Sequence, residues 1–199
     1  MTTRLVLVRH ATCASTEHVL LGRAIDAALD ARGEAQARAL AQRLSVESPD
    51  VLQASPRRRT LETAHAIAGR TGCTVGIAPA LDEVDFGAWC GQSFDQLEAD
   101  AGWREWNARR ASARTPAGED MAGVRARVLP HLQALAQAFA GGLLVLVTHA
   151  EVIRAVVLHH LGMSADEFHR VAIAPASLTT LRIDGGTSRL VRINEQVAA

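Results

Sequence analysis

The sequence predicts a three-layer α/β sandwich, with a mainly parallel central sheet, helices on both faces and an antiparallel edge. Two Leu- and Val-rich runs, at 3–8 and 143–147, are typical of parallel strands that are buried on both faces. Helix-like and strand-like segments alternate after the first of them. Near the C-terminus, polar and apolar residues alternate on both sides of the turn 184–187, which is typical of a hairpin at a sheet edge.

The composition indicates one compact domain that spans residues 1–199. Hydrophobic residues make up 48% of the chain and charged residues 21%, which excludes a disordered or fibrous protein. The 21 Lys and Arg residues balance the 21 Asp and Glu residues, so no net charge draws the chain to nucleic acid or to a membrane surface. Any recognition of anions must therefore be local. The composition does not decide whether the protein forms a homo-oligomer.

The expected location and the expected lack of a cofactor both rest on features that are missing from the sequence. No apolar run approaches the roughly 20 residues of a membrane helix, and the first residues lack the features of a signal peptide, so we expect a cytoplasmic protein. The cysteines, Cys13, Cys73 and Cys90, are odd in number and show no CxxC spacing, which argues against a disulfide framework and a zinc ribbon. We therefore expect reduced thiols, no metal and no other cofactor.

The first half of the chain predicts alternating strands and helices. Asp30 is a good N-cap for a helix that Pro49 ends, and Gly69 closes the next helix. The predicted elements are, in order, a strand at 3–8, a helix at 30–47, a strand at 50–54, a helix at 58–69 and a strand at 73–77.

Residues 81–116 have a less regular pattern that contains all three tryptophans. We interpret this stretch as loops and short helices that form a lid-like insertion, at about 84–117, over one end of the sheet. The tryptophans suit the wall of a substrate pocket and the closure of the lid equally well. The elements predicted beyond it are a helix at 119–140 that Pro130 kinks or breaks, a strand at 143–147, a helix at 151–161 and a hairpin of 177–183 with 188–193.

One short sequence occurs twice. The run LVLVRHA from Leu5 to Ala11 returns as LVLVTHA from Leu144 to Ala150, so two buried strands each end in a histidine. Ligands of open α/β sheets bind beyond the carboxyl ends of the strands. If these strands are neighbours, His10 and His149 reach the same crevice. The general likeness of buried strands explains the apolar run, but it does not explain a histidine at the same exit position twice.

Arginines gather near the same strand ends. Arg9 precedes His10, and the run 57–59 places three arginines at the start of a predicted helix, where the helix dipole makes them unfavourable unless anions lie nearby. A solvated basic turn accounts for one or two of the three. Guanidinium groups match phosphoryl oxygens, and an imidazole can attack phosphorus, so these residues point to phosphoryl chemistry.

Several motifs follow one another along the chain. They are LVRHA at 7–11, GRAIDAALDARGEAQA at 22–37, SPRRRTLETA at 55–64, LDEVDFGAWCG at 81–91, GE at 118–119 and THA at 148–150. In this order they resemble the histidine phosphatase superfamily, the phosphoglycerate-mutase-like phosphohydrolases, over most of the chain. The resemblance implies a phosphoglycerate mutase-like fold and metal-independent hydrolysis of phosphomonoesters through a phosphohistidine.

The resemblance also implies roles for individual residues. His10 is the nucleophile. Arg9, Arg59 and His149 bind the phosphoryl oxygens, which singles out Arg59 from its run of arginines. The other candidates for binding phosphate or substrate are Thr16, Gly22, Arg23 and Ala150.

Two carboxylates near the expected site raise alternatives. The resemblance makes Glu83 the general acid and then the base that activates water, while Asp85 is the alternative acid. Glu151 stands where the pattern has Gly. Either its carboxylate lies near the phosphate and raises the cost of binding a dianion, or it faces away and stabilises the first turn of its helix.

The ligand expected from these residues is a small phosphorylated metabolite. The segments 22–23 and 148–155 resemble α-ribazole phosphatases as much as broad phosphosugar phosphatases, so the substrate stays undefined. The alternative functions are a phosphomutase and a non-catalytic module that binds a phosphorylated ligand. A mutase needs an enclosing lid, and the stretch 90–117 is short, so we expect an open cover and hydrolysis.

Overall fold

The central sheet has six strands in the order β3-β2-β4-β1-β5-β6 in the computed structural model, which describes residues 1–14 and 18–198. The first four strands in the chain run parallel, and the last two form an antiparallel hairpin that pairs through β5 with β1. The strands are β1 (Thr3–Arg9), β2 (Val51–Ala54), β3 (Val75–Ile77), β4 (Leu143–Thr148), β5 (Ser177–Asp184) and β6 (Thr187–Gln196). This mixed sheet confirms the predicted fold class.

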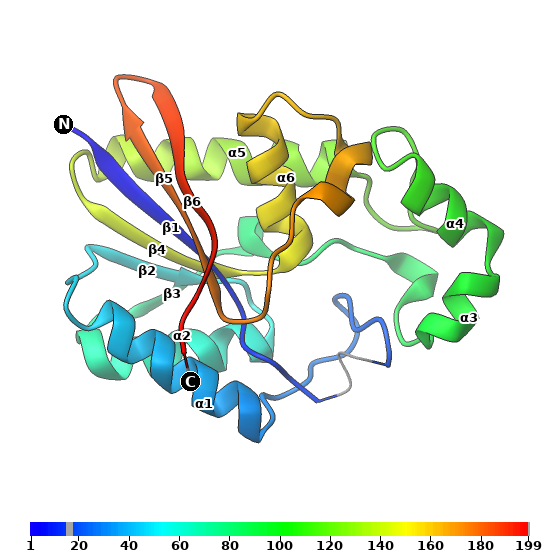
Figure 1. Ribbon diagram of the computed structural model, residues 1–199, viewed down its shortest axis with the longest axis horizontal. Helices are drawn as coiled ribbons and strands as arrows, with labels where there is room; N and C mark the ends of the chain where they lie inside the picture. The colour runs from blue at the N-terminus through cyan, green and yellow to red at the C-terminus, as the bar shows by residue number, and fades with distance from the viewer. Residues whose placement is uncertain (15–17, 199) are drawn as a thin grey trace.

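Helices cover both faces of the sheet. One face is covered by α1 (Ala31–Leu44) and α2 (Arg58–Thr71), and the other by α5 (Met121–Ala138) and α6 (Ala150–His160) (Figure 1). The shorter helices are α3 (Phe94–Ala99), α4 (Ala101–Ala108) and the 3₁₀ helices η1 (Pro79–Leu81), η2 (Gly87–Trp89) and η3 (Ala165–Arg170). Within the described ranges, no helix is long and apolar enough to cross a membrane.

The alternating side chains of the repeated strand sequence hold the layers together. Leu5 and Leu7 are buried in the core under α5 and α6, whereas Val6 and Val8 are buried in the core under α1 and α2. In β4, Leu144 and Leu146 are likewise buried under α5 and α6, and Val145 and Val147 under α1 and α2. Burial of each such side chain is worth about 1.5–3 kcal/mol, so the strand sequence fixes which face of the sheet each helix pair covers.

The register of β1 against β4 explains the repeated sequence. Leu5 pairs with Leu144 and Arg9 pairs with Thr148, so equivalent positions of the two runs lie side by side. The backbone N–H of His10 then donates to the carbonyl oxygen of Thr148 at 2.9 Å. Both histidines therefore leave the sheet at the same edge.

One helix start follows its predicted signal, and two predictions are corrected. The Asp30 side chain caps α1 by accepting from the N–H of Gly33 at 2.7 Å. Gly69 does not close α2, which continues to Thr71 and ends at Gly72, where a φ of +75° favours glycine. The break expected at Pro130 does not occur, because α5 continues through it to Ala138. Val128 and Leu132 on either side are buried, and their packing offsets the one backbone hydrogen bond that proline removes.

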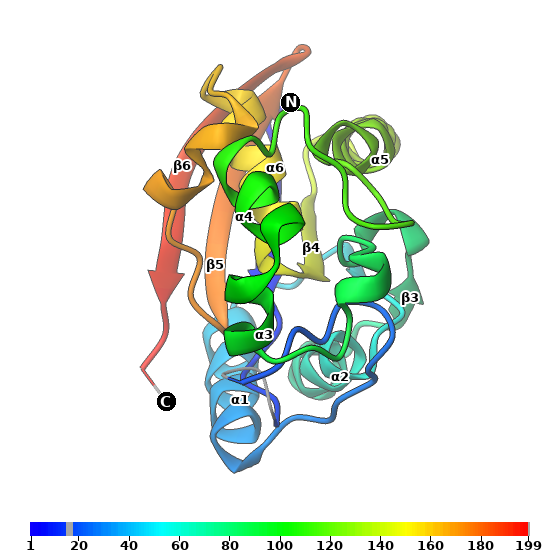
Figure 2. The same ribbon diagram turned by 90° about the vertical axis from the view of Figure 1, so that its right-hand side faces the viewer.

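The predicted lid lies beyond the carboxyl ends of the parallel strands. Figure 2 shows α3 and α4 in front of the sheet edge. An aromatic cluster stabilises this region: Trp89 packs against Trp103 at 5.3 Å between ring centroids and against Trp106 at 6.4 Å. All three tryptophan side chains are buried, and Trp103 also lines the cavity described next.

Candidate active site

A cavity of about 270 Å³ opens at the carboxyl ends of β1 and β4. Its wall combines polar residues from the strand ends with apolar residues from the lid and the first loop. The lining residues are Arg9, His10, Val19, Leu20, Leu21, Gly22, Arg59, Glu83, Phe86, Phe94, Trp103, Arg110, Ala150, Glu151 and Arg154.

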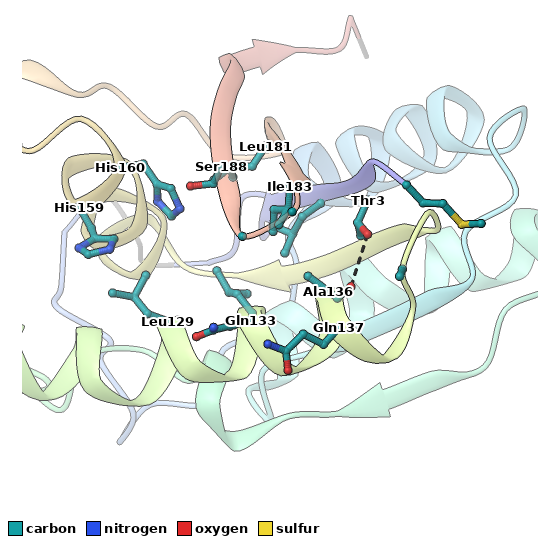
Figure 3. Close-up of a pocket in the computed structure, with 16 residues that line it drawn as sticks. Thr3, Leu129, Gln133, Ala136, Gln137, His159, His160, Leu181, Ile183 and Ser188 are labelled. Carbon is teal, nitrogen blue, oxygen red and sulfur yellow. Dashed lines mark hydrogen bonds between the residues drawn. The ribbon is translucent and has the colours of Figure 1, made fainter.

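A second cavity, of about 430 Å³, lies around the amino-terminal half of β1. It is lined by α5, by His159 and His160 at the end of α6, and by the β5–β6 hairpin (Figure 3). Its lining contains no Arg, Lys, Asp or Glu side chain within the described chain. Phosphoryl chemistry needs cationic partners for the oxygens, so the smaller cavity is the candidate active site.

His10 follows β1 and is only 4% exposed. Its Nδ1 lies 2.8 Å from the carbonyl oxygen of Ala11, and because a carbonyl only accepts, Nδ1 carries the proton. Nε2 therefore holds the lone pair that a nucleophile needs. Burial, together with the positive charges of Arg59 and Arg9, holds the pKa of the His10 imidazole well below 6.5, so the ring is neutral at pH 7.

His149 follows β4 and lies beside His10, with 5.3 Å between the ring centroids. Its Nδ1 is 3.2 Å from a terminal nitrogen of Arg59 and 3.6 Å from a carboxyl oxygen of Glu83. Burial, and next to it the charge of Arg59, holds the pKa of His149 well below 6.5. The ring is therefore neutral in the free protein, and a bound dianion would favour its protonation.

Arg9 and Arg59 bring two positive charges to the cavity wall. Arg59 is 2% exposed and donates to the carbonyl oxygen of Gly22 at 2.9 Å. Arg9 donates to the carbonyl oxygen of Ile173 at 2.6 Å, and its buried Nε has no hydrogen-bond partner among residues 1–14 and 18–198.

The other two arginines of the run 57–59 have partners elsewhere. Arg57 forms an ion pair with Asp82, and Arg58 forms one with Glu62 on the next turn of α2. Of the three, only Arg59 lines the cavity in the described part of the chain. Carboxylates therefore compensate two arginines at this helix start, while the third faces the site.

Glu83 has the properties of a proton donor. Burial raises the pKa of its carboxyl from 4.5 to about 7, although the charge of Arg59 opposes the rise. A carboxyl with this pKa can release and regain a proton near neutral pH. Asp85 is outside the cavity wall in the described chain: its carboxylate accepts from the N–H of Gly87 at 3.0 Å and is 42% exposed. The geometry favours Glu83 over Asp85.

Gly22 and Ala150 lie in the cavity wall. Gly22 has a φ of +52°, and a Cβ added there would lie 2.4 Å from the Sγ atom of Cys90, so only glycine fits. Ala150 is the first residue of α6, whose first backbone N–H groups have no acceptor within the helix. Both positions allow backbone groups to approach an anion closely.

Arg23 is close to the cavity but does not line it in the described structure. Its guanidinium donates to the carbonyl oxygen of Glu83 at 2.7 Å and to the carboxylate of Glu119 at 2.9 Å. In this arrangement Arg23 supports the backbone of Glu83, and its contact with substrate stays a prediction. Thr16 lies outside the described residues.

Three charged residues of the cavity wall form an arginine–glutamate cluster: Arg110, Glu151 and Arg154. Glu151 forms ion pairs with both arginines. Arg110 is buried, with its guanidinium 3.4 Å from the centroid of the Phe168 ring. Glu151 thus lines the cavity and also lies in the first turn of α6, and the cluster as a whole carries one positive charge. The carboxylate of Glu151 is therefore paired and does not present an uncompensated negative charge to a phosphate.

The sequence held a partial signal for this cluster. Arg154 follows Glu151 by three residues, a spacing that predicts an ion pair on a helix. Arg110 has no such signal, because only the packing of the lid against α6 brings it to Glu151.

Comparison with known proteins identifies the family. A sequence model of the histidine phosphatase superfamily (branch 1) matches residues 5–196. The chain belongs to this superfamily. Its membership confirms the resemblance predicted from the motifs.

Relatives of this histidine phosphatase carry phosphatase and mutase names. The chain is 29% identical over 196 residues to phosphoserine phosphatase 1 of Hydrogenobacter thermophilus, covering 96% of this chain and 92% of that protein. It is 32% identical over 181 residues to a probable phosphoglycerate mutase GpmB of Enterobacter sp., covering 89% and 83%. A solved mycobacterial glucosyl-3-phosphoglycerate phosphatase superposes with a TM-score of 0.88 at 27% identity, covering 98% and 100%.

These findings confirm the predicted class of this histidine phosphatase superfamily member, a phosphohydrolase enzyme that acts on small phosphorylated metabolites. The residue roles are not tested by them. The likeness to α-ribazole phosphatases also stays a prediction.

Proposed function

We propose that the chain hydrolyses a small phosphomonoester by moving its phosphoryl group first to Nε2 of His10 and then to water. The observation that carries this proposal is the tautomer of His10. The hydrogen bond from Nδ1–H to Ala11 leaves a lone pair on Nε2 of a neutral ring that shares the cavity wall with buried Arg59 and half-buried Arg9. A nucleophile and two cationic partners for phosphoryl oxygens therefore share one cavity.

The reaction has two halves. In the first, Nε2 of His10 forms a bond to phosphorus while the ester oxygen leaves and takes the proton of Glu83. Arg9, Arg59 and His149 bind the remaining phosphoryl oxygens, where negative charge is stabilised. In the second half, ionised Glu83 takes a proton from water, the oxygen of that water attacks phosphorus, and the N–P bond breaks. Inorganic phosphate and the free His10 ring result.

The arginine–glutamate cluster in the cavity wall suits a substrate that carries a carboxylate besides its phosphate. The arginine–glutamate cluster has one excess positive charge, and Arg154 uses two of its five N–H donors, one for Val171 and one for Glu151. The relatives reported above are named for phosphoserine, phosphoglycerate and glucosyl-3-phosphoglycerate, and each of these compounds carries a carboxylate. We infer that Arg154 binds the carboxylate of a compound of this class.

Replacement of Arg154 with methionine is expected to lower kcat/KM for phosphoserine by about 10- to 100-fold, because one charge-assisted hydrogen bond contributes about 1.5–3 kcal/mol. The value for phosphoethanolamine, which has no carboxylate, is expected to change much less. The ratio of kcat/KM for phosphoserine to kcat/KM for phosphoethanolamine is measured. Loss of Arg154 also frees the Glu151 carboxylate, but its repulsion of the phosphate affects both substrates and cancels in this ratio.

A matched control is Arg114→Met. Arg114 is an exposed lid arginine paired with Asp120, and its loss should leave the ratio unchanged. Equal losses for both substrates in Arg154→Met would contradict a carboxylate site.

A screen of phosphomonoesters tests the proposed function and its alternatives. Release of inorganic phosphate is expected, at the same rate before and after dialysis against a chelator, since imidazole, guanidinium and carboxyl groups supply every step. With 3-phosphoglycerate and a bisphosphoglycerate primer, phosphate release should exceed isomerisation. Faster primer-dependent isomerisation would assign a mutase, and ligand binding without turnover would assign a binding module.

A further inference from the structure

Behind His149, a chain of buried polar groups leads away from the cavity. Nε2 of His149 lies 2.8 Å from Oγ of Ser55, and this hydroxyl donates to Oδ1 of Asp82 at 3.2 Å. Arg57 holds Asp82 through two hydrogen bonds, each 3.0 Å long. Ser55 is fully buried and Asp82 is 7% exposed. Ser55 and Asp82 are not part of the cavity wall within the described residues.

The direction of each hydrogen bond follows from the chemistry of the groups. An ionised carboxylate in an ion pair only accepts, so the hydroxyl hydrogen of Ser55 points to Asp82. Oγ of Ser55 then offers a lone pair to His149, whose Nε2 must carry the proton. Nδ1 is left with the lone pair, and it faces a terminal nitrogen of Arg59 at 3.2 Å and Glu83 at 3.6 Å. The opposite tautomer would set an Nδ1–H against an N–H of Arg59.

Asp82 also contacts the neighbouring acid. Its Oδ1 accepts the backbone N–H of Glu83 at 2.8 Å. One buried carboxylate therefore fixes the peptide that carries Glu83 and, through Ser55, the ring of His149. Glu83 lines the cavity, and the fully buried His149, which is not part of the cavity wall in the described chain, lies 3.6 Å from a carboxyl oxygen of Glu83.

We propose that Ser55 and Asp82 are positioning residues that hold His149 as the Nε2–H tautomer, with Nδ1 directed at the transferring phosphoryl group. This role rests on the proposed function for its chemistry, but the tautomer belongs to the free protein. A bound phosphate dianion favours uptake of a proton from solvent at Nδ1, and the resulting imidazolium donates from Nδ1 to a phosphoryl oxygen and from Nε2 to Ser55. Asp82 stabilises that cation through the hydroxyl.

The test combines nitrogen NMR of protein labelled with ¹⁵N-histidine and steady-state kinetics. In the unmodified protein, the His149 signal, assigned by its loss in His149→Gln, should show the proton on Nε2. Ser55→Ala removes the acceptor, so a population with the proton on Nδ1 should appear and kcat should fall by about 10- to 100-fold, more than KM changes. In Asp82→Asn, the side-chain amide can donate to Ser55, which then donates to Nε2, so the proton should again move to Nδ1.

Thr60→Val is the matched control. Thr60 is buried in the first turn of α2, five residues after Ser55. Its hydroxyl donates to the carbonyl oxygens of Ser55 at 2.8 Å and Arg57 at 2.6 Å and has no hydrogen bond to His149 among the described residues. It should leave the tautomer and kcat near their original values.

Three results would overturn the positioning role. The first is a His149 proton that stays on Nε2 in Ser55→Ala, with kcat within about twofold of the unmodified protein. The second is the same outcome in Asp82→Asn, which is the variant to use if Ser55→Ala does not fold. The third is an equal tautomer change in Thr60→Val. An Nε2–H tautomer in a protein without phosphatase activity would instead refute the proposed function and leave the hydrogen-bond assignment standing.

Discussion

Replacement of His10 with alanine is expected to abolish turnover, with a fall in kcat of about 10⁶-fold, on the scale seen when a covalent nucleophile is removed. His10 lines the cavity and has a free Nε2, whereas His149 is fully buried and is not part of the cavity wall in the described chain. No phosphorylated enzyme should form. Initial rates with a phosphomonoester, measured at high enzyme concentration, give the size of the loss.

Binding provides the control for the His10 variant. Arg9 and Arg59 keep their contacts with Ile173 and Gly22, which do not involve His10. His10→Ala should therefore still bind inorganic phosphate or vanadate in calorimetry. Turnover that survives in this variant would contradict a phosphohistidine mechanism.

Replacement of Glu83 with glutamine is expected to lower kcat for alkyl phosphates by about 10²- to 10⁴-fold, the usual contribution of a general acid. An aryl phosphate needs no proton on its leaving group, so it should still phosphorylate the variant rapidly. Because Glu83 also activates water, one equivalent of phenol should be released in a burst, followed by a slow phase. Stopped-flow measurement of the phenolate separates the two steps.

The pH profile supplies an independent check on the same residue. Burial raises the pKa of Glu83 to about 7, so the proton is present below that pH and is lost above it. For an alkyl phosphate, kcat/KM should fall as pH rises through about 7, and this limb should disappear in Glu83→Gln. Asp85→Asn is the matched control, since the exposed Asp85 carboxylate accepts the N–H of Gly87 outside the cavity wall of the described chain, and it should retain the limb. Equal losses for alkyl and aryl esters in Glu83→Gln would point to a structural role.

The pairing of the two histidines is predictable from sequence for a physical reason. Strands buried on both faces need apolar runs, and parallel neighbours end at one sheet edge, so a repeated run that ends in histidine places both rings together. The observed register, with Arg9 opposite Thr148, confirms this argument. The preference for Glu83 over Asp85 came from the motif, because a two-residue spacing alone does not tell which carboxyl is buried.

The rest of the site depends on contacts that no local pattern encodes. Arg110 reaches Glu151 only because the lid packs on α6, and Arg110 stacks on Phe168 from a third segment. Arg23 lies in a phosphatase-like motif, yet the fold pairs it with Glu119 far along the chain. The missing break at Pro130 has the same origin, since tertiary packing of α5 outweighs a local preference.

Capture of the phosphorylated enzyme during turnover tests the central claim most directly. Rapid quenching with a radiolabelled phosphomonoester, followed by peptide mapping, is predicted to recover label that is labile in acid, stable in base and attached to the peptide that contains His10. The label should form and decay fast enough to account for kcat. Full-rate release of phosphate with no such adduct, or label on the peptide that contains His149, would contradict the account.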